Sequence, residues 1–159
     1  METNKLKAIL RSHKLWLETS GLQGVKADLR GADLQNIRLD DANLCRADLR
    51  GADFENANLQ SVNLRGADLR GANLKGANLQ NANLHFADFN RANLRDANLQ
   101  NADLRATLFE RADLRGATCA LNLKDIQYFG FAKVSKEHLP WLALHRYWSN
   151  WFRTLKVFP

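Results

Sequence analysis

A repeat of five residues runs through the middle of the chain and limits what the chain can fold into more than any other feature. One position in five, which we call position i, is Leu or Phe from Leu29 onward, and the series ends at Cys119 after nineteen copies without an insertion. Position i−2 is Ala in every copy except three, where Ile37, Val62 and Thr107 replace it. Because large and small apolar residues recur at fixed positions, all copies are expected to share one interior.

Neither a regular helix nor a regular strand has a period of five. In a helix, a step of five residues advances about 140° net, so the residues at position i would scatter around the cylinder instead of forming a stripe. In an extended chain, positions i−2 and i face the same side, but the next apolar residue arrives three places later. The chain is therefore predicted to coil, with one short extended side and one corner in each pentapeptide.

The outward positions repeat every twenty residues. If one turn of the coil contains four pentapeptides, residues twenty apart lie above one another, so the column is predicted to have four sides and about five turns. The recurring columns are Asp28, Asp48, Asp68 and Asp88; Arg30, Arg50 and Arg70; Asn58, Asn78 and Asn98; and Gln60, Gln80 and Gln100.

Tandem copies of A(D/N)LXX, as in GADLRGANLKGANLQNANL at residues 66–84, resemble the pentapeptide repeat family, and the resemblance covers residues 22–120. It implies a right-handed quadrilateral parallel β-helix, an all-β solenoid of about five coils. Asn and Asp at position i−1 suit the turn, because their short side chains can bond to nearby backbone. Glycines at position i+2 are interpreted as corner residues.

Each flank of the repeat is predicted to cover one end of the column, so that the chain forms a single folding unit. Residues 1–21 place apolar residues at helical spacing and are expected to form an N-terminal capping helix, in which His13 is a packed side chain. Residues 121–159 are predicted to form a C-terminal cap with an aromatic helix that begins at Pro140. This helix could cap the column, form a homodimer or lie on a membrane, and its aromatic anchors are Trp141, Trp148, Trp151 and Phe152.

Three walls of the column differ in chemistry. The charged wall alternates Asp and Arg, the amide wall is nearly all Asn and Gln above its first coil, and the basic wall leans positive. Their positions i are Leu29, Leu49 and Leu69 for the charged wall; Leu39, Leu59, Leu79 and Leu99 for the amide wall; and Leu44, Leu64 and Leu84 for the basic wall.

Two groups of residues are candidates for binding a partner. Arg46, Arg65 and Arg105 make the basic wall positive. Phe86 and Leu108 are apolar residues near one corner, at positions that are polar in most copies, and exposed apolar clusters are often interaction sites. The chain's own C-terminal segment is an alternative cover for this apolar corner.

The net charge of +6 is confined to the flanks, because residues 22–120 contain as many acidic as basic residues. No apolar stretch is long enough to cross a bilayer, and the amino terminus lacks the apolar core of a secretory signal, so a cytoplasmic protein is expected.

A column filled by its own side chains leaves no concavity for catalysis, so no enzyme is expected. The Cys and His residues lack metal-ligand spacing, and neither a metal nor a cofactor is expected. The sequence predicts a rigid scaffold or regulator that binds a protein partner whose identity it leaves open. The resemblance implies a second hypothesis, since some family members mimic DNA and bind gyrase, although this repeat is neutral where they are acidic. A third hypothesis is that the basic flanks bind nucleic acid or an anionic membrane.

Overall fold

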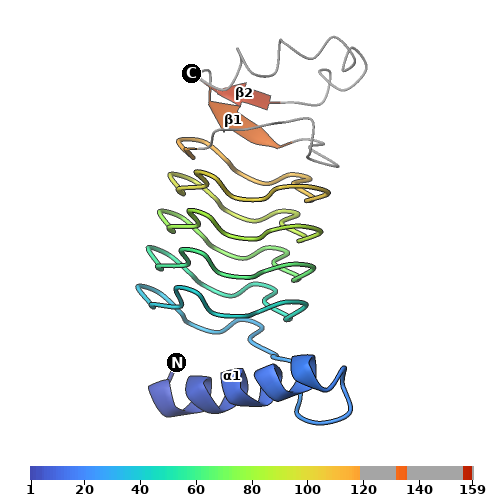
Figure 1. The fold of residues 1–159 in the computed structure, drawn as a ribbon. Helices are drawn as coiled ribbons and strands as arrows, with labels where there is room; N and C mark the ends of the chain where they lie inside the picture. Colours follow the sequence, from blue (N-terminus) through green and yellow to red (C-terminus); the bar gives the residue numbers. More distant parts are fainter. Residues whose placement is uncertain (119–131, 136–155, 159) are drawn as a thin grey trace.

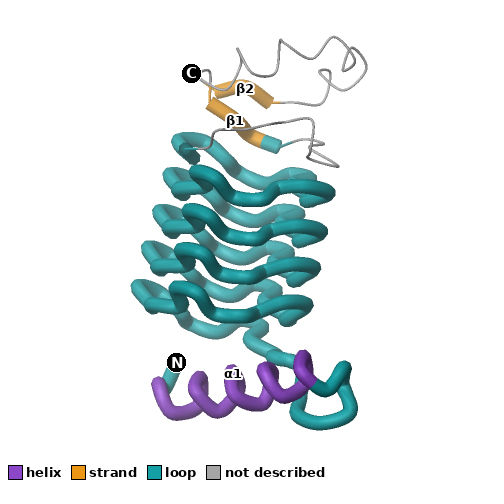
Figure 2. Tube along the Cα trace, in the orientation of Figure 1, coloured by secondary structure: helices purple, strands orange, loops and turns teal. Residues whose placement is uncertain are grey.

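The computed structural model describes residues 1–118, 132–135 and 156–158. Helix α1 (Thr3–Glu18) lies across one end of a column of stacked coils, and strands β1 (Lys133–Ser135) and β2 (Lys156–Phe158) lie at the other end (Figure 1). Figure 2 shows that the coils consist of loops and turns, and single-residue bridges join them.

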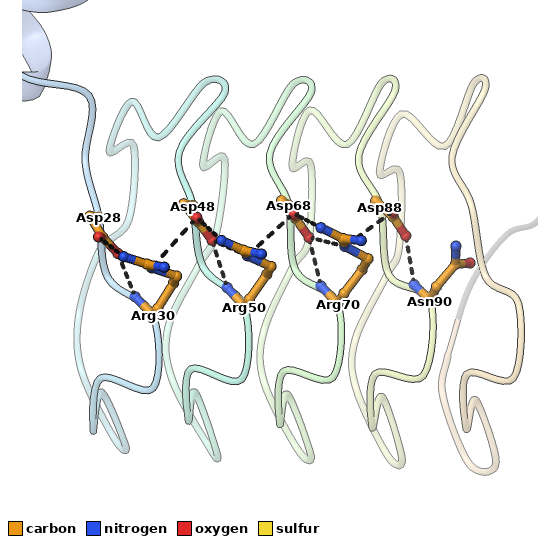
Figure 3. A network of polar contacts seen from close by, with 8 residues as sticks. All are labelled: Asp28, Arg30, Asp48, Arg50, Asp68, Arg70, Asp88 and Asn90. Atoms are coloured by element: carbon orange, nitrogen blue, oxygen red, sulfur yellow. Dashed lines mark hydrogen bonds and ion pairs between the residues drawn. The ribbon is translucent and has the colours of Figure 1, made fainter.

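Each coil contains twenty residues and has four sides. A parallel bridge joins Asp48 to Asp68, and equivalent bridges join the other i−1 residues to those twenty positions later. Around these bridges the N–H of Leu69 donates to the carbonyl of Asp88 (2.8 Å), and the N–H of Asp68 donates to the carbonyl of Ala47 (3.0 Å). The predicted period of twenty is confirmed, and the Asp column of the charged wall is visible in Figure 3.

Every corner uses the same backbone turn. The N–H of Ala72 donates to the carbonyl of Leu69 (3.0 Å), and the N–H of Arg70 donates to Oδ1 of Asp68 (3.2 Å). The residue at i+2 has a positive φ, which is the left-handed conformation that favours glycine. The interpretation of the glycines as corner residues is confirmed for Gly31, Gly51, Gly66, Gly71, Gly76 and Gly116.

The interior is filled by the side chains at i and i−2. Phe89 and Phe109 are fully buried and stack with 5.4 Å between ring centroids. Thr107 replaces Ala at i−2, and its buried hydroxyl donates to the carbonyl of Leu84 (3.0 Å). The interior of the column is therefore a packed core whose polar exception is hydrogen-bonded.

Helix α1 covers the first coil and confirms the predicted N-terminal cap. Its inner side buries Leu6 and His13. The helix ends in a turn where the N–H of Gly21 donates to the carbonyl of Trp16 (2.8 Å), while Ser20 takes the left-handed conformation with φ 54°. Gly21 is left-handed as well, with φ 90°, so these two residues together reverse the chain.

The twenty-residue register continues past the last recognisable pentapeptide. Lys133 forms a parallel bridge with Asp113, its N–H donates to the carbonyl of Ala112 (2.8 Å), and its carbonyl accepts from Leu114 (2.8 Å). Ala132 is fully buried, as an i−2 residue of a further coil would be. The period of five is lost after Cys119, as the sequence predicts, but the period of twenty resumes on the side of the coil that contains Ala132 and Lys133.

Strands β1 and β2 pair in parallel, with Val134 opposite Val157. The alternation of residues between Cys119 and Pro140 predicts an irregular last strand or loop, and β1 lies in that segment; the sequence predicts a helix after Pro140 and does not predict the pairing with β2. The aromatic residues of that predicted helix, at 141–155, lie outside the described residues, so capping, dimerisation and membrane contact remain predictions for them.

Candidate functional site

One corner of the column carries an aromatic side chain between basic residues. Outward residues stack in two neighbouring columns, one at i+1 and one at i+2, along the edge of the basic wall. We name this surface the Phe86 corner, and it comprises Arg46, Arg65, Gly66, His85, Phe86, Arg105 and Ala106.

Phe86 is the central residue of this corner. It is 54% exposed, and among residues 27–118 it is the one large apolar side chain that is exposed. Its backbone is fixed because its N–H donates to the carbonyl of Arg105 (3.1 Å), and its ring stacks on His85 with 4.1 Å between centroids and 17° between planes. Phe86 also has φ 60°, a conformation that is uncommon for a bulky residue. The fold thus holds an aromatic ring in solvent on a rigid turn.

Two cations of this corner, on the coils that precede the coil of Phe86 in the sequence, have no acidic partner among the described residues. Arg46 and Arg65 are exposed, and within the part of the chain that the structure describes neither forms an ion pair. The Cγ atom of Arg46 is 3.6 Å from the place that a Cβ on Gly66 would take, so its side chain rises along the corner toward the coil of Phe86.

Arg105 lies on the coil that follows the coil of Phe86, and its positive charge is neutralised by Asp103. Its Nε and Nη2 atoms donate to the carboxylate of Asp103 at 2.8 and 2.7 Å. The Arg105 side chain holds the pKa of the Asp103 carboxyl below its ordinary value, burial opposes this, and His85 lowers the pKa further. The basic side of the corner therefore lies toward the N-terminal end, at Arg46 and Arg65.

The apolar patch predicted from Phe86 and Leu108 is only partly formed. Leu108 is half-buried on the charged wall, where it bridges to Asp88 and its N–H donates to the carbonyl of Ala87 (3.0 Å). Ala106 is half-buried as well. The exposed apolar surface is that of Phe86, and the predicted residues Trp141, Trp148, Trp151 and Phe152 lie outside the described part of the chain.

The Asp and Arg side chains of the charged wall form ion pairs with one another. Each Arg Nη2 lies 2.6 Å from the Asp on its own coil, and each Arg Nε lies 3.6–3.8 Å from the Asp on the next coil (Figure 3). Hydrogen bonds from the Arg30 side chain lower the pKa of the Asp28 carboxyl to about 2. The pairs on single coils are Asp28–Arg30, Asp48–Arg50 and Asp68–Arg70.

The amide wall is also bonded along its height. Asn78 Nδ2 donates to Asn58 Oδ1 (3.3 Å), Asn98 Nδ2 donates to Asn78 Oδ1 (3.3 Å), and Thr118 Oγ1 donates to Asn98 Oδ1 (3.2 Å). These ladders use the side-chain groups at position i−1, and the described residues of this wall include no exposed large apolar side chain that could anchor a partner. We therefore place the candidate site at the Phe86 corner rather than on the amide or the charged wall.

Neither metal binding nor membrane spanning has support in the described residues. Within residues 1–118, 132–135 and 156–158, no group of three or more His, Cys, Asp or Glu residues could hold a metal ion. In the same part of the chain no helix has the length and apolarity to cross a bilayer.

Comparisons with known proteins agree with this geometry. The chain is similar to Rfr23, a pentapeptide repeat protein from the cyanobacterium Cyanothece 51142, with 39% identity over 60% of this chain and a TM-score of 0.52. That match spans 61% of Rfr23. The chain is 32% identical to alr5209, a pentapeptide repeat protein from Nostoc Pcc 7120, over 72% of this chain and 91% of that chain, with a TM-score of 0.41.

A likeness in fold alone extends to QnrB1, a plasmid-mediated fluoroquinolone resistance protein. That match has 20% identity, covers 79% of this chain and 72% of that chain, and has a TM-score of 0.56. No curated protein matches the sequence. The profile of the family described as pentapeptide repeats matches residues 25–60, 57–96 and 92–120, with eight copies. The coils, their twenty-residue register and this match together show that the chain belongs to the pentapeptide repeat family.

Proposed function

We propose that this protein is a rigid, non-catalytic scaffold that binds a protein partner through the Phe86 corner. The observation that carries the proposal is the exposed ring of Phe86, held on a hydrogen-bonded turn in a column whose other large apolar side chains are covered. Aromatic residues that are rigid and exposed lose little conformational freedom on binding, and they are frequent anchors of protein interfaces.

The charges around Phe86 define the partner's surface. Arg46 and Arg65 offer two unpaired cations below the ring, so the complementary surface is an apolar socket with carboxylates on one side. Arg105 is already paired with Asp103 and contributes less. The orientation of a bound partner would follow from this asymmetry.

A non-catalytic role is supported by the packing of the column. The side chains at i and i−2 fill its interior. Within the amide wall Asn side chains bond to one another, and within the charged wall Asp side chains pair with Arg side chains. Catalysis needs a pocket in which a nucleophile, acid or base is held against a substrate. The column offers flat walls and corners instead, which suit binding.

DNA mimicry directed at gyrase receives less support from the surface. A DNA mimic needs a continuous acidic face. On the charged wall Asp28, Asp48 and Asp68 are each paired with an Arg on the same coil, and residues 22–120 have no net charge. Unchanged supercoiling by gyrase in the presence of the purified protein is the expected result.

The proposal is tested by affinity capture from the native cell with matched variants. Phe86→Ala is expected to reduce the amount of captured partner by roughly ten-fold or more, since it removes the anchor. Arg46→Gln combined with Arg65→Gln should slow association and reduce its salt dependence.

Arg95→Gln is the matched control, because Arg95 is an exposed cation on a different wall and forms no ion pair with any described residue. Capture that survives Phe86→Ala unchanged would remove the Phe86 corner from consideration. Equal loss in Arg95→Gln would show that general charge, rather than this corner, determines binding.

A further inference from the structure

The outer side of the N-terminal cap carries exposed aliphatic side chains that the column does not need. Leu22 is 89% exposed, Val25 is 68% exposed and Leu15 is 39% exposed. They are close together, since a Cβ on Gly24 would lie 3.1 Å from the Cβ of Leu15 and Gly24 directly precedes Val25. Leu22 and Val25 belong to the loop between α1 and the first coil, at the same end of the molecule as the helix (Figure 1).

Hydrogen bonds hold the loop in the conformation that exposes Leu22 and Val25. The N–H of Val25 lies 2.9 Å from Ser12 Oγ and 3.3 Å from the Ser12 carbonyl, and bonds to both hold the loop against α1. Thr19 Oγ1 donates to the carbonyl of Leu15 (2.8 Å) and accepts from the N–H of Gln23 (2.9 Å). The loop is therefore fixed with its aliphatic side chains in water.

Gly24 explains why the loop can approach the helix so closely. A Cβ at this position would lie within 2.7 Å of the backbone N of Trp16 and closer still to the carbonyl of Ser12. Its φ of 73° also favours glycine. No other residue fits here without moving the loop, so the sequence preserves a tight turn that keeps Val25 outside.

Exposed basic side chains lie on the helix at the same end of the molecule. Lys7, Arg11 and Lys14 follow one another at helical spacing along one flank of α1, next to the side that buries Leu6 and His13, and Lys14 Nζ lies 3.7 Å from Glu18 Oε1. Over residues 1–26 the basic side chains are Lys5, Lys7, Arg11, Lys14 and Lys26, and the acidic side chains are Glu2 and Glu18.

We infer that the outer side of the cap is a docking surface for an anionic lipid membrane. The cap exposes both aliphatic side chains and an excess of cations, and these match the two parts of such a surface, because acyl chains accept the former and acidic headgroups attract the latter. A second copy of the chain fits less well, since two positively charged caps would repel. Nucleic acid would use the cations but would leave Leu22 and Val25 in water.

The inferred contact gives the column a defined orientation. Because α1 lies across the end of the column, a membrane against its outer side would be roughly parallel to the planes of the coils (Figure 1). The Phe86 corner would then remain in solution, above the lipid. Membrane docking therefore goes beyond the proposed function and does not depend on it.

The test is co-sedimentation of the full chain with vesicles. Binding is expected to vesicles with about 30% phosphatidylserine, to be far weaker with phosphatidylcholine alone, and to fall as salt is raised. Leu22→Ser combined with Val25→Ser should lower the affinity by roughly ten-fold or more, because the inserting groups are lost. The affinity should also fall when three cations are removed together, because the attraction to acidic headgroups is lost; the substitutions are Lys7→Gln, Arg11→Gln and Lys14→Gln.

The controls separate this inference from others. Phe86→Ala and Arg95→Gln change an exposed ring and an exposed cation on the column, and both should bind vesicles like the parent protein. Circular dichroism should show that all variants are folded. Vesicle binding that is absent, or that is unchanged by the Leu22/Val25 variant, would overturn the inference. So would duplex DNA binding that competes fully with vesicles and ignores this variant.

Discussion

The column and the N-terminal cap bury their interiors by different means. In the column each coil covers the one before it, and the same hydrogen bonds recur, as from Leu69 to Asp88 (2.8 Å) and from Leu49 to Asp68 (2.8 Å). The cap is one helix with a single buried layer, formed by Leu6 and His13. Stability in the column is therefore spread over many equivalent contacts, whereas the cap depends on a few.

His13 shows how the cap depends on single atoms. Its Nδ1 accepts a hydrogen bond from the N–H of Ala27 (3.1 Å), which joins α1 to the start of the first coil. This bond assigns the proton of the neutral ring to Nε2, which is buried and has no hydrogen-bond partner among the described residues. Burial lowers the pKa of His13, the backbone of Cys45 opposes this, and Lys26 lowers the pKa further.

The largest expected effect comes from removing a side chain in the middle of the column. Phe89→Ala should lower the free energy of unfolding by about 3–5 kcal/mol, because it leaves a cavity beside Phe109. Leu6→Ala in the cap should cost less, since a smaller side chain is removed from a less completely buried position, with Leu6 5% exposed and Phe89 0%. Urea denaturation followed by circular dichroism measures both, and equal losses would contradict the difference between column and cap.

A second test separates the regions by pH. The folded-state pKa of His13 is below its ordinary value of 6.5, so the neutral ring favours the folded cap. The stabilisation is complete above about pH 6.5 and is lost as the pH falls toward and through the lowered pKa. The protection factors of the α1 amides, which are exchange rates corrected for the intrinsic rate at each pH, should therefore be lower at pH 5 than at pH 7.5, while the protection factors of the middle coils should change little. In His13→Leu this pH dependence of α1 should disappear.

A third, smaller effect uses one substitution at two positions of the column. Ala106 has φ 55° at a corner, so Ala106→Gly should raise the free energy of unfolding by about 0.5–1 kcal/mol. Ala77→Gly, at a buried i−2 position, should lower it, because a packed methyl group is lost. Thermal unfolding of the two variants should shift in opposite directions, and shifts of the same sign would refute the role of the corner conformation.

The smallest effect is expected on the charged wall. The Asp28 carboxyl has its pKa lowered to about 2, and Arg50 lowers that of Asp48. Carboxylates with lowered pKa values stabilise the fold above about pH 4, and this contribution is lost as the pH falls through the folded-state values. Arg50→Gln should cost roughly an order of magnitude less than Phe89→Ala, and high salt should reduce that cost. Urea titrations at pH 7 and pH 3 measure it, and a loss that ignores both salt and pH would contradict the ion-pair account.

The column could be predicted in detail because the periods of five and twenty residues specify its sides and coils, while the hand of the coil came from the family resemblance. The spacing between Asp28 and Asp48 predicts the coil, the alanines at i−2 predict a narrow interior, and Gly66 and its equivalents predict the corners. The N-terminal helix could be predicted from the spacing of Leu6 and His13. In each case one local rule acts together with the repeat.

The features that were missed lie where the repeat loses its consensus. Ala132 and Lys133 lie twenty residues beyond Ala112 and Asp113, so the period of twenty predicts their position although the period of five is lost between them. The position of Leu108 in the repeat suggests an exposed side chain. Side chains at i−1 lie along the wall, however, and most of those in the middle coils are half-buried, as Leu108 is. The exposure of Leu22 follows from the hydrogen bonds of the loop, which no sequence pattern reveals.

Because of the twenty-residue register, the number of coils determines the distance between the cap and a side chain on the column. Since a coil touches only its neighbours, adding or removing one block of twenty residues between the cap and Phe86 would change their separation by about 4.8 Å and leave Phe86 on the same corner. Adding five residues would instead move Phe86 a quarter turn around the axis. The reach of such a molecule and the direction in which it presents a side chain can therefore be set independently.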